Sequence, residues 1–252
     1  MSHQPQPLHW HTEGNDLTRL LALSDGLFAT VLTILVLDLK LPDLSQVASQ
    51  GDPRRALDDL AIRLFSYVMT FIVAGVFWMS HHSDFRYVER YNRRLLWYNL
   101  MFLLFVGLLP FSTAGLGNGL TVFSWSIYAL NIMAIGVMSA LTWGYAYTHR
   151  LMNSEMPRQL ARRQGFRHLI TPGVFLISIG VAYLAPNAYL APWSLLAIPV
   201  ITRLLDRRVH DKDAQPMAKE PRSVALFWGL APLLLLFIFV AAGLLAFITI
   251  QH

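Results

Sequence analysis

The chain has 252 residues, of which 55% are hydrophobic and 14% are charged, with a formal net charge of +5 and no cysteine. A soluble domain carries about 25% charged residues, so this composition excludes an ordinary soluble protein and indicates an integral membrane protein. The absence of cysteine excludes disulfides and thiolate metal sites. Because the basic residues fall in short segments between apolar runs, they indicate membrane topology rather than a nucleic-acid surface.

Seven apolar runs of roughly 20 residues are long enough to cross a bilayer as helices. The expected spans lie at about 18–39, 60–80, 95–115, 121–147, 169–185, 188–205 and 224–250. The fifth and sixth are separated only by Pro186-Asn187, which favours a tight hairpin of short helices, although Pro192 and Pro199 also fit a re-entrant segment. The fold class that follows is an all-α integral membrane protein.

The charged segments between the apolar runs indicate how the chain is divided into parts and how it is oriented in the membrane. The expected parts are an N-terminal tail at 1–17, a six-helix domain at 18–208, a polar linker at 209–223 and an additional apolar helix at 224–252. The most basic connections follow the second and fourth runs, with Arg86, Arg90, Arg93 and Arg94 in the first and Arg150, Arg158, Arg162, Arg163 and Arg167 in the second. Because basic loops stay in the cytoplasm, the N-terminus is also expected there.

The first run carries polar residues at a depth where such groups are costly and usually functional. At about 100° per residue, Gly26, Thr30, Thr33 and Leu37 fall within about 60° of one another and form one narrow stripe. The Ser-Asp pair just before Gly26 lies off that stripe. The helix is therefore expected to have two different neighbours, a pore or close helix contact on the stripe side and a group that satisfies a carboxylate on another side.

Ser24 and Asp25 need partners from other helices. Arg19 is six residues from Asp25, a rotation of about 240° that prevents the pairing seen between residues three or four apart. Candidate partners near the same end of the neighbouring helices are Trp78, His81 and His82, followed by Ser83 and Asp84, and Asn99. Indole and imidazole N–H groups are donors that suit a buried Ser-Asp pair.

Several of these residues also have plainer interpretations. The two threonines of the stripe would often be bonded to their own helix at a small-residue contact. His81 and His82 with Asp84 suggest a metal site, but adjacent histidines point to different faces of a helix, so a buried structural His82 is favoured and no metal or cofactor is expected. Asn131, in the fourth run, is expected to make an interhelical hydrogen bond.

A set of motifs runs along the first four fifths of the chain. It consists of Arg19-x-x-x-Leu23-Ser24-Asp25-Gly26, Phe77-Trp78-Met-Ser-His81-His82, Arg93-Arg94-Leu-Leu-Trp97-x-Asn99-Leu, Leu109-Pro110-Phe111 and, more loosely, Arg167-His-Leu-Ile-x-Pro172. In this order the motifs resemble those of the transmembrane protein 175 family of potassium channels, whose signature is Arg-x-x-x-Phe-Ser-Asp.

The resemblance implies a six-helix subunit that assembles as a homotetramer, with the first helices of four subunits around a central pore. Counted from the signature Asp25, the family's pore positions fall on Thr30, Thr33 and Leu37, which are three of the four stripe positions. The polar residues off the stripe are then expected to form an interhelical network that holds the pore helix. The members of that network are Arg19, Ser24, Asp25, Trp78, His82 and Asn99.

The chain departs from the family at two positions of the first helix. The signature Phe is Leu23, which keeps the position apolar. The first pore position, which usually holds a large aliphatic residue taken to form a hydrophobic gate, is Thr30. A ring of leucine or isoleucine can close a pore by dewetting, whereas threonine can hydrogen-bond water. Either the constriction has moved to the level of Leu37 or this pore closes differently.

The function implied is passive conduction of K⁺ across the cell membrane of a prokaryote, without enzymatic activity and without a nucleic-acid partner. The chain has no Thr-Val-Gly-Tyr-Gly filter, so selectivity for K⁺ over Na⁺ is expected to be moderate, with a proton leak through the same pore as a variant. Two other classes stay open. A secondary transporter would show inverted repeats and broken helices, and an intramembrane enzyme would be built on His81, His82 and Asp84.

Overall fold

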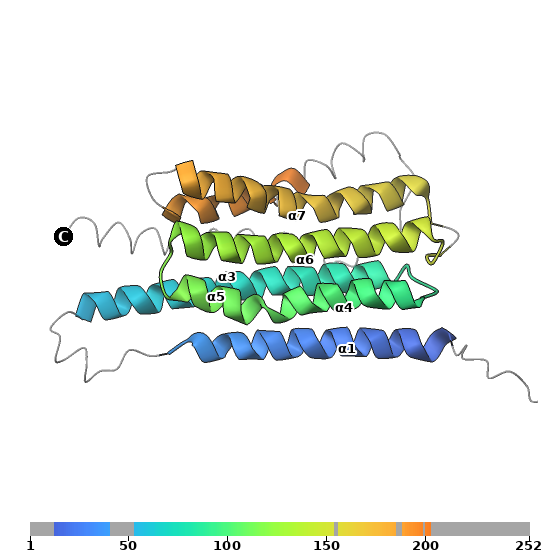
Figure 1. The fold of residues 1–252 in the computed structure, drawn as a ribbon, viewed down its shortest axis with the longest axis horizontal. Helices are drawn as coiled ribbons and strands as arrows, with labels where there is room; N and C mark the ends of the chain where they lie inside the picture. Colours follow the sequence, from blue (N-terminus) through green and yellow to red (C-terminus); the bar gives the residue numbers. More distant parts are fainter. Residues whose placement is uncertain (1–12, 41–52, 154–155, 185–187, 199, 203–252) are drawn as a thin grey trace, which may run out of the picture.

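The computed structural model describes residues 13–40, 53–153, 156–184, 188–198 and 200–202. Its helices are α1 (Glu13–Ile34), η1 (Leu35–Asp38), α3 (Pro53–Phe85), α4 (Arg93–Gly107), α5 (Leu109–Gly117), α6 (Val122–Thr148), α7 (Arg158–Leu184) and η2 (Ala188–Leu196). Their apolar composition explains a bundle in which the long helices run side by side (Figure 1). The predicted all-α class is confirmed.

Five spans are long and apolar enough to cross a membrane: Leu17–Asp38, Ala56–Phe85, Arg93–Gly117, Val122–Thr148 and Arg158–Leu184. They correspond to the first five predicted runs. The third is broken between α4 and α5 at Leu108, two residues before Pro110. Proline has no N–H to continue the α4 ladder, but it fits the first turn of a new helix, so the span continues as α5.

The predicted start of the fifth helix, at about residue 169, is wrong. Helix α7 begins at Arg158, so the arginines expected in a loop from Arg158 to Arg167 lie on its first turns. The apolar run marks only the part of a helix that is inside hydrocarbon, and a helix can continue into the headgroup region with basic residues on it.

The sixth predicted run is shorter and less regular than expected. It begins as the 3₁₀ segment η2, and the apolar helical stretch runs from Leu190 to Thr202. Ala191 and Leu195 are buried in the same core as Phe175 of α7, so η2 packs back against α7. The hairpin interpretation and the six-helix count both stay predictions. The linker at 209–223 and the apolar run at 224–250 lie outside the described residues.

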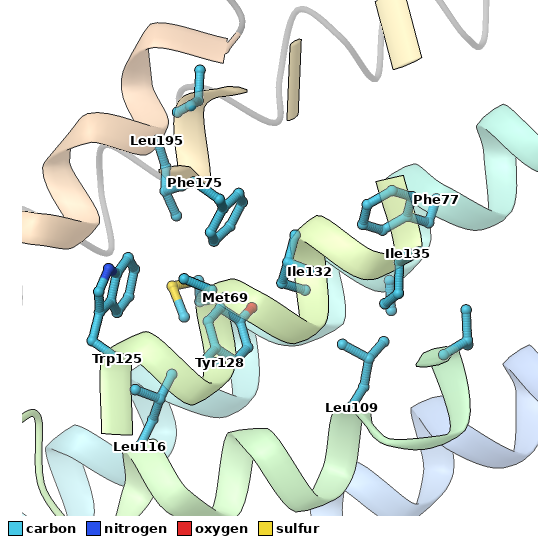
Figure 2. Close-up of a cluster of buried hydrophobic side chains, with 14 of the residues drawn as sticks. Met69, Phe77, Leu109, Leu116, Trp125, Tyr128, Ile132, Ile135, Phe175 and Leu195 are labelled. Atoms are coloured by element: carbon cyan, nitrogen blue, oxygen red, sulfur yellow. The ribbon is translucent and has the colours of Figure 1, made fainter. Parts of the chain in front are cut away.

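The core of the bundle is built around α6, which lies between α5 and α7 in Figure 1. Figure 2 shows its largest buried cluster, with labelled side chains Met69, Phe77, Leu109, Leu116, Trp125, Tyr128, Ile132, Ile135, Phe175 and Leu195. Trp125 is fully buried and its indole Nε1 donates to Ser178 Oγ on α7 at 3.1 Å. Helix α1 lies at the edge of the bundle, on the side opposite α7 (Figure 1).

Two loops meet at the end of the bundle where α1 begins. The backbone of the α3–α4 loop pairs with that of the α6–α7 loop through a bridge between Val88 and Met152, and Glu89 N–H donates to the carbonyl of Leu151 at 2.9 Å. Both loops are the basic connections that the sequence predicts in the cytoplasm. Their pairing brings the loop residues Arg86, Arg90 and Arg150 to the same end of the molecule as the arginines that begin α4 and α7.

Candidate functional site

Helix α1 packs on the bundle with one face and leaves the other open. Leu20, Ser24, Phe28, Val31 and Leu35 are buried against the described bundle. All four stripe residues, Gly26, Thr30, Thr33 and Leu37, are exposed, and Leu37 is 70% exposed. The stripe therefore lies on the face of α1 that the described part of this chain leaves uncovered.

The hydroxyls of the stripe are bonded to their own helix. Thr30 Oγ1 donates to the carbonyl of Gly26 at 2.8 Å, and Thr33 Oγ1 donates to the carbonyl of Thr30 at 2.8 Å. Each hydroxyl proton is thereby used, and the oxygen lone pairs remain available on the exposed face. Leu37 follows in the 3₁₀ turn η1, where each residue turns by about 120° rather than 100°, so it is displaced sideways from the straight stripe.

Ser24 belongs to a buried hydrogen-bonded chain that joins three helices. Asn99 of α4 donates from Nδ2 to Ser24 Oγ at 3.2 Å, and Asn99 Oδ1 lies 2.8 Å from His81 Nε2 of α3. Ser24 Oγ in turn donates to the carbonyl of Leu20 at 3.0 Å. Ser24 and Asn99 are fully buried and His81 is 5% exposed. In this geometry His81 Nε2 carries the proton that Asn99 accepts.

Asp25 makes a separate contact at the surface of the chain. Trp78 Nε1 donates to Asp25 Oδ1 at 2.9 Å, and Trp78 remains 39% exposed. The ring of His82 lies beside that of Trp78, with centroids 5.9 Å apart. Arg19 is exposed one and a half turns before Asp25 and makes no ion pair with another described residue. The predicted network members thus fall into a buried set and an exposed set.

The interpretation of His82 as the buried histidine is wrong for the single chain. His82 is exposed, and the buried ring is that of His81, which stacks on Phe102 with centroids 5.1 Å apart. The signal was present in the spacing, because Ala74, Phe77, His81 and Asp84 follow the helical period of one buried face, and His82 lies about 100° away from it.

Other buried polar groups tie the remaining helices together. Thr113 Oγ1 of α5 donates to Thr70 Oγ1 of α3 at 2.9 Å, and Thr70 is 3.3 Å from the hydroxyl of Tyr128 on α6. The predicted interhelical bond of Asn131 is confirmed, since its Nδ2 donates to Ser112 Oγ at 3.2 Å. These contacts give polar groups inside the bundle the hydrogen-bond partners that water would otherwise provide. They lie away from the open face of α1.

Asp84 is also buried, at the end of α3, and contacts α7. Gln164 Nε2 donates to Asp84 Oδ1 at 2.9 Å, while His168 Nε2 lies 3.1 Å from Asp84 Oδ2 without the alignment of a hydrogen bond. His168 Nδ1 is 3.0 Å from Ser139 Oγ. Within the described ranges, no group of three or more histidine or carboxylate side chains is placed to hold a metal ion.

Comparison with known proteins agrees with the motifs. Residues 19–110 match the model of the family described as endosomal/lysosomal potassium channel TMEM175. A potassium channel of Streptomyces collinus is 31% identical over 202 residues, which cover 75% of this chain and 97% of that protein. A potassium channel of a Chryseobacterium species is 28% identical and covers 76% of this chain and 95% of that protein.

A mouse protein named endosomal/lysosomal proton channel TMEM175 is 25% identical over 82% of this chain. The matched part makes up 44% of the mouse protein. The crystal structure of a lysosomal potassium-selective channel TMEM175 homolog from Chamaesiphon minutus superposes with a TM-score of 0.63 at 25% identity, covering 77% of this chain and 97% of that one.

The helical bundle and these similarities define a multi-pass membrane protein of an ion-channel family. The polar contacts around α1 involve the same residues that carry the sequence motifs. The chain belongs to the transmembrane protein 175 family of potassium channels.

Proposed function

We propose that this chain forms a homotetrameric K⁺ channel that conducts passively through a central pore lined by α1. The observation that carries the proposal is the open face of α1, where Gly26, Thr30, Thr33 and Leu37 are all exposed although the opposite face is packed. Four copies arranged around an axis would turn these faces toward one another. The relatives named as potassium channels support conduction of K⁺.

The chemistry of the stripe suits a weakly selective cation path. With their protons donated to helix carbonyls, Thr30 and Thr33 present hydroxyl oxygens that can accept from water or coordinate a partly dehydrated cation. No carboxylate lies on the stripe, so binding is weak and an ion can leave readily. We propose that selectivity for K⁺ over Na⁺ is moderate, that protons leak through the same path, and that Leu37 forms the apolar constriction.

The polar residues off the stripe are proposed to hold α1 in place rather than to touch the ion. Ser24 is fixed to α4 through Asn99, and Asp25 is fixed to α3 through Trp78. Arg19 and His82 are exposed near these contacts and are proposed to complete the network in the tetramer. The proposed location is the cell membrane, with the N-terminus in the cytoplasm because α1 begins at the arginine-rich end (Figure 1).

Ion flux from liposomes tests this function and separates it from a secondary transporter. Purified protein in K⁺-loaded vesicles should release K⁺ down its gradient when no other ion gradient is imposed, with slower release of Na⁺ from matched vesicles. Release that occurs only when a second ion gradient is supplied would contradict a passive channel and favour coupled transport.

Replacing Thr33 by leucine should reduce K⁺ flux by roughly tenfold or more, because four apolar side chains at one level of a narrow pore exclude water. The measurement is the rate of K⁺ release from liposomes at equal protein content. Thr148→Leu is the matched control, since Thr148 is also exposed and also bonded to its own helix, but on α6. Equal rates for wild type and Thr33→Leu would count against α1 as the pore helix.

A further inference from the structure

The exposed face of α7 changes from basic to apolar along its length. Arg158, Arg162 and Phe166 follow one another at intervals of four residues and are all exposed, with Phe166 at 61%. At about 100° per residue they are joined on the same side of the helix by Leu169 and Leu176, which are 52% and 60% exposed. One continuous surface therefore presents two guanidinium groups and then apolar side chains.

The apolar part of this face has the length of a bilayer core. It runs from Phe166 to Leu184, which is about 28 Å at a rise of 1.5 Å per residue, against a hydrocarbon thickness of about 30 Å. Tyr183, 69% exposed, lies at its far end, where aromatic rings with a polar group sit at an interface. Arg158 and Arg162 are therefore at headgroup level, just outside the hydrocarbon.

The charges around these arginines favour an anionic ligand. Besides Arg19 of α1, the loops and helix starts at this end carry seven exposed arginines: Arg86, Arg90, Arg93, Arg94, Arg150, Arg158 and Arg162. Near the paired loops, Asp84 is buried and bonded to Gln164, and Glu89 is exposed on the α3–α4 loop, while Glu13, Asp16 and Asp25 lie on α1. Neither Arg158 nor Arg162 forms an ion pair with a described carboxylate. Helix α7 lies on the side of the bundle away from α1 (Figure 1).

We infer that Arg158 and Arg162 bind the phosphate of an anionic phospholipid in the adjacent leaflet, whose acyl chains lie along Phe166, Leu169 and Leu176. Guanidinium groups suit this role because they donate paired hydrogen bonds to phosphate oxygens and are weakly hydrated. The spacing of four residues places both groups over the same lipid, and the aromatic ring one turn further in packs against its glycerol and upper acyl region. This inference does not depend on α1 lining the pore.

The test measures binding of dioleoylphosphatidylglycerol to the full chain in neutral detergent, with dioleoylphosphatidylcholine as the uncharged comparison. Native mass spectrometry counts retained lipids, and thermal unfolding gives the stabilisation that each lipid provides. Wild type should retain phosphatidylglycerol in preference to phosphatidylcholine. The double variant Arg158→Gln with Arg162→Gln should weaken lipid retention by roughly tenfold or more and abolish most of the stabilisation. Each arginine near an anionic headgroup strengthens binding several-fold, and the effects of the two multiply.

Arg86→Gln with Arg90→Gln is the matched control, because it removes the same charge from exposed positions at the same end. That pair should retain phosphatidylglycerol as wild type does. Equal loss in both double variants would mean a general charge effect and would overturn a site on α7. Unchanged retention in the Arg158 and Arg162 variant would also overturn it.

Discussion

Replacing Gly136 by alanine is expected to lower the free energy of unfolding by about 1–3 kcal/mol, the range found for overpacked cores. A Cβ at Gly136 would lie 2.6 Å from Cγ and 2.7 Å from Cδ of Pro172, closer than carbon atoms can approach. The proline ring is rigid and is buried in the middle of α7, so α6 and α7 must separate. Because these helices share much of the core, including the contact of Trp125 with Ser178, the loss should spread through the bundle.

The measurement is thermal or denaturant unfolding of the purified protein in one detergent. Gly173→Ala is the matched control, since Gly173 adjoins Pro172 on α7 but is exposed, with open space around its missing Cβ. Alanine there should leave stability unchanged or raise it by up to about 1 kcal/mol, because it removes the entropy cost of a helical glycine. If Gly136→Ala were as stable as Gly173→Ala, the close approach of α6 and α7 would be contradicted.

Replacing Asn99 by leucine is expected to cost about 1–3 kcal/mol, because it leaves His81 and one side of Ser24 without a hydrogen-bond partner in the core. Asn99 is fully buried and is the only described link between Ser24 Oγ on α1 and the His81 ring on α3. Its loss should also loosen α1, so K⁺ flux from liposomes should fall more than the yield of folded protein does.

Two further variants separate this effect from a general change in polarity. Asn118→Leu makes the same substitution at an exposed residue that accepts a bond from Arg63, and it should alter stability by no more than about 0.5 kcal/mol. Adding His81→Leu to Asn99→Leu should cost less than the sum of the two single changes, since both unsatisfied partners are then apolar. Strict additivity would show that Asn99 and His81 do not interact.

The spanning helices that coincide with a single apolar run of the sequence were predictable. The runs at 18–39 and 121–147 agree closely with Leu17–Asp38 and Val122–Thr148, because hydrocarbon thickness fixes the length of a spanning helix. The stripe of α1 was predictable for a related reason, since residues three and four apart share a face of any α-helix. The start of α7 was not, because nothing in an apolar scale distinguishes a basic loop from a basic helical turn.

The polar contacts were only partly predictable. Trp78 and Asn99 could be named as donors near Ser24 and Asp25, but which donor meets which acceptor depends on the rotation of α3 and α4 about their axes. That rotation buries His81 and exposes His82, which had been predicted to be the buried histidine. The contact between Thr70 and Thr113 had no local signal, since it joins residues of different helices through packing alone.

The most direct test of the central claim is thiol accessibility on α1, for which the chain is suited because it has no cysteine of its own. A positively charged thiol reagent should block K⁺ flux through Thr33→Cys, because that side chain is proposed to face the water-filled path. Leu176→Cys, also exposed in the single chain but on α7, at the side of the bundle away from α1 (Figure 1), should keep its flux. Full flux through modified Thr33→Cys, or equal block at Leu176→Cys, would contradict a pore lined by the stripe.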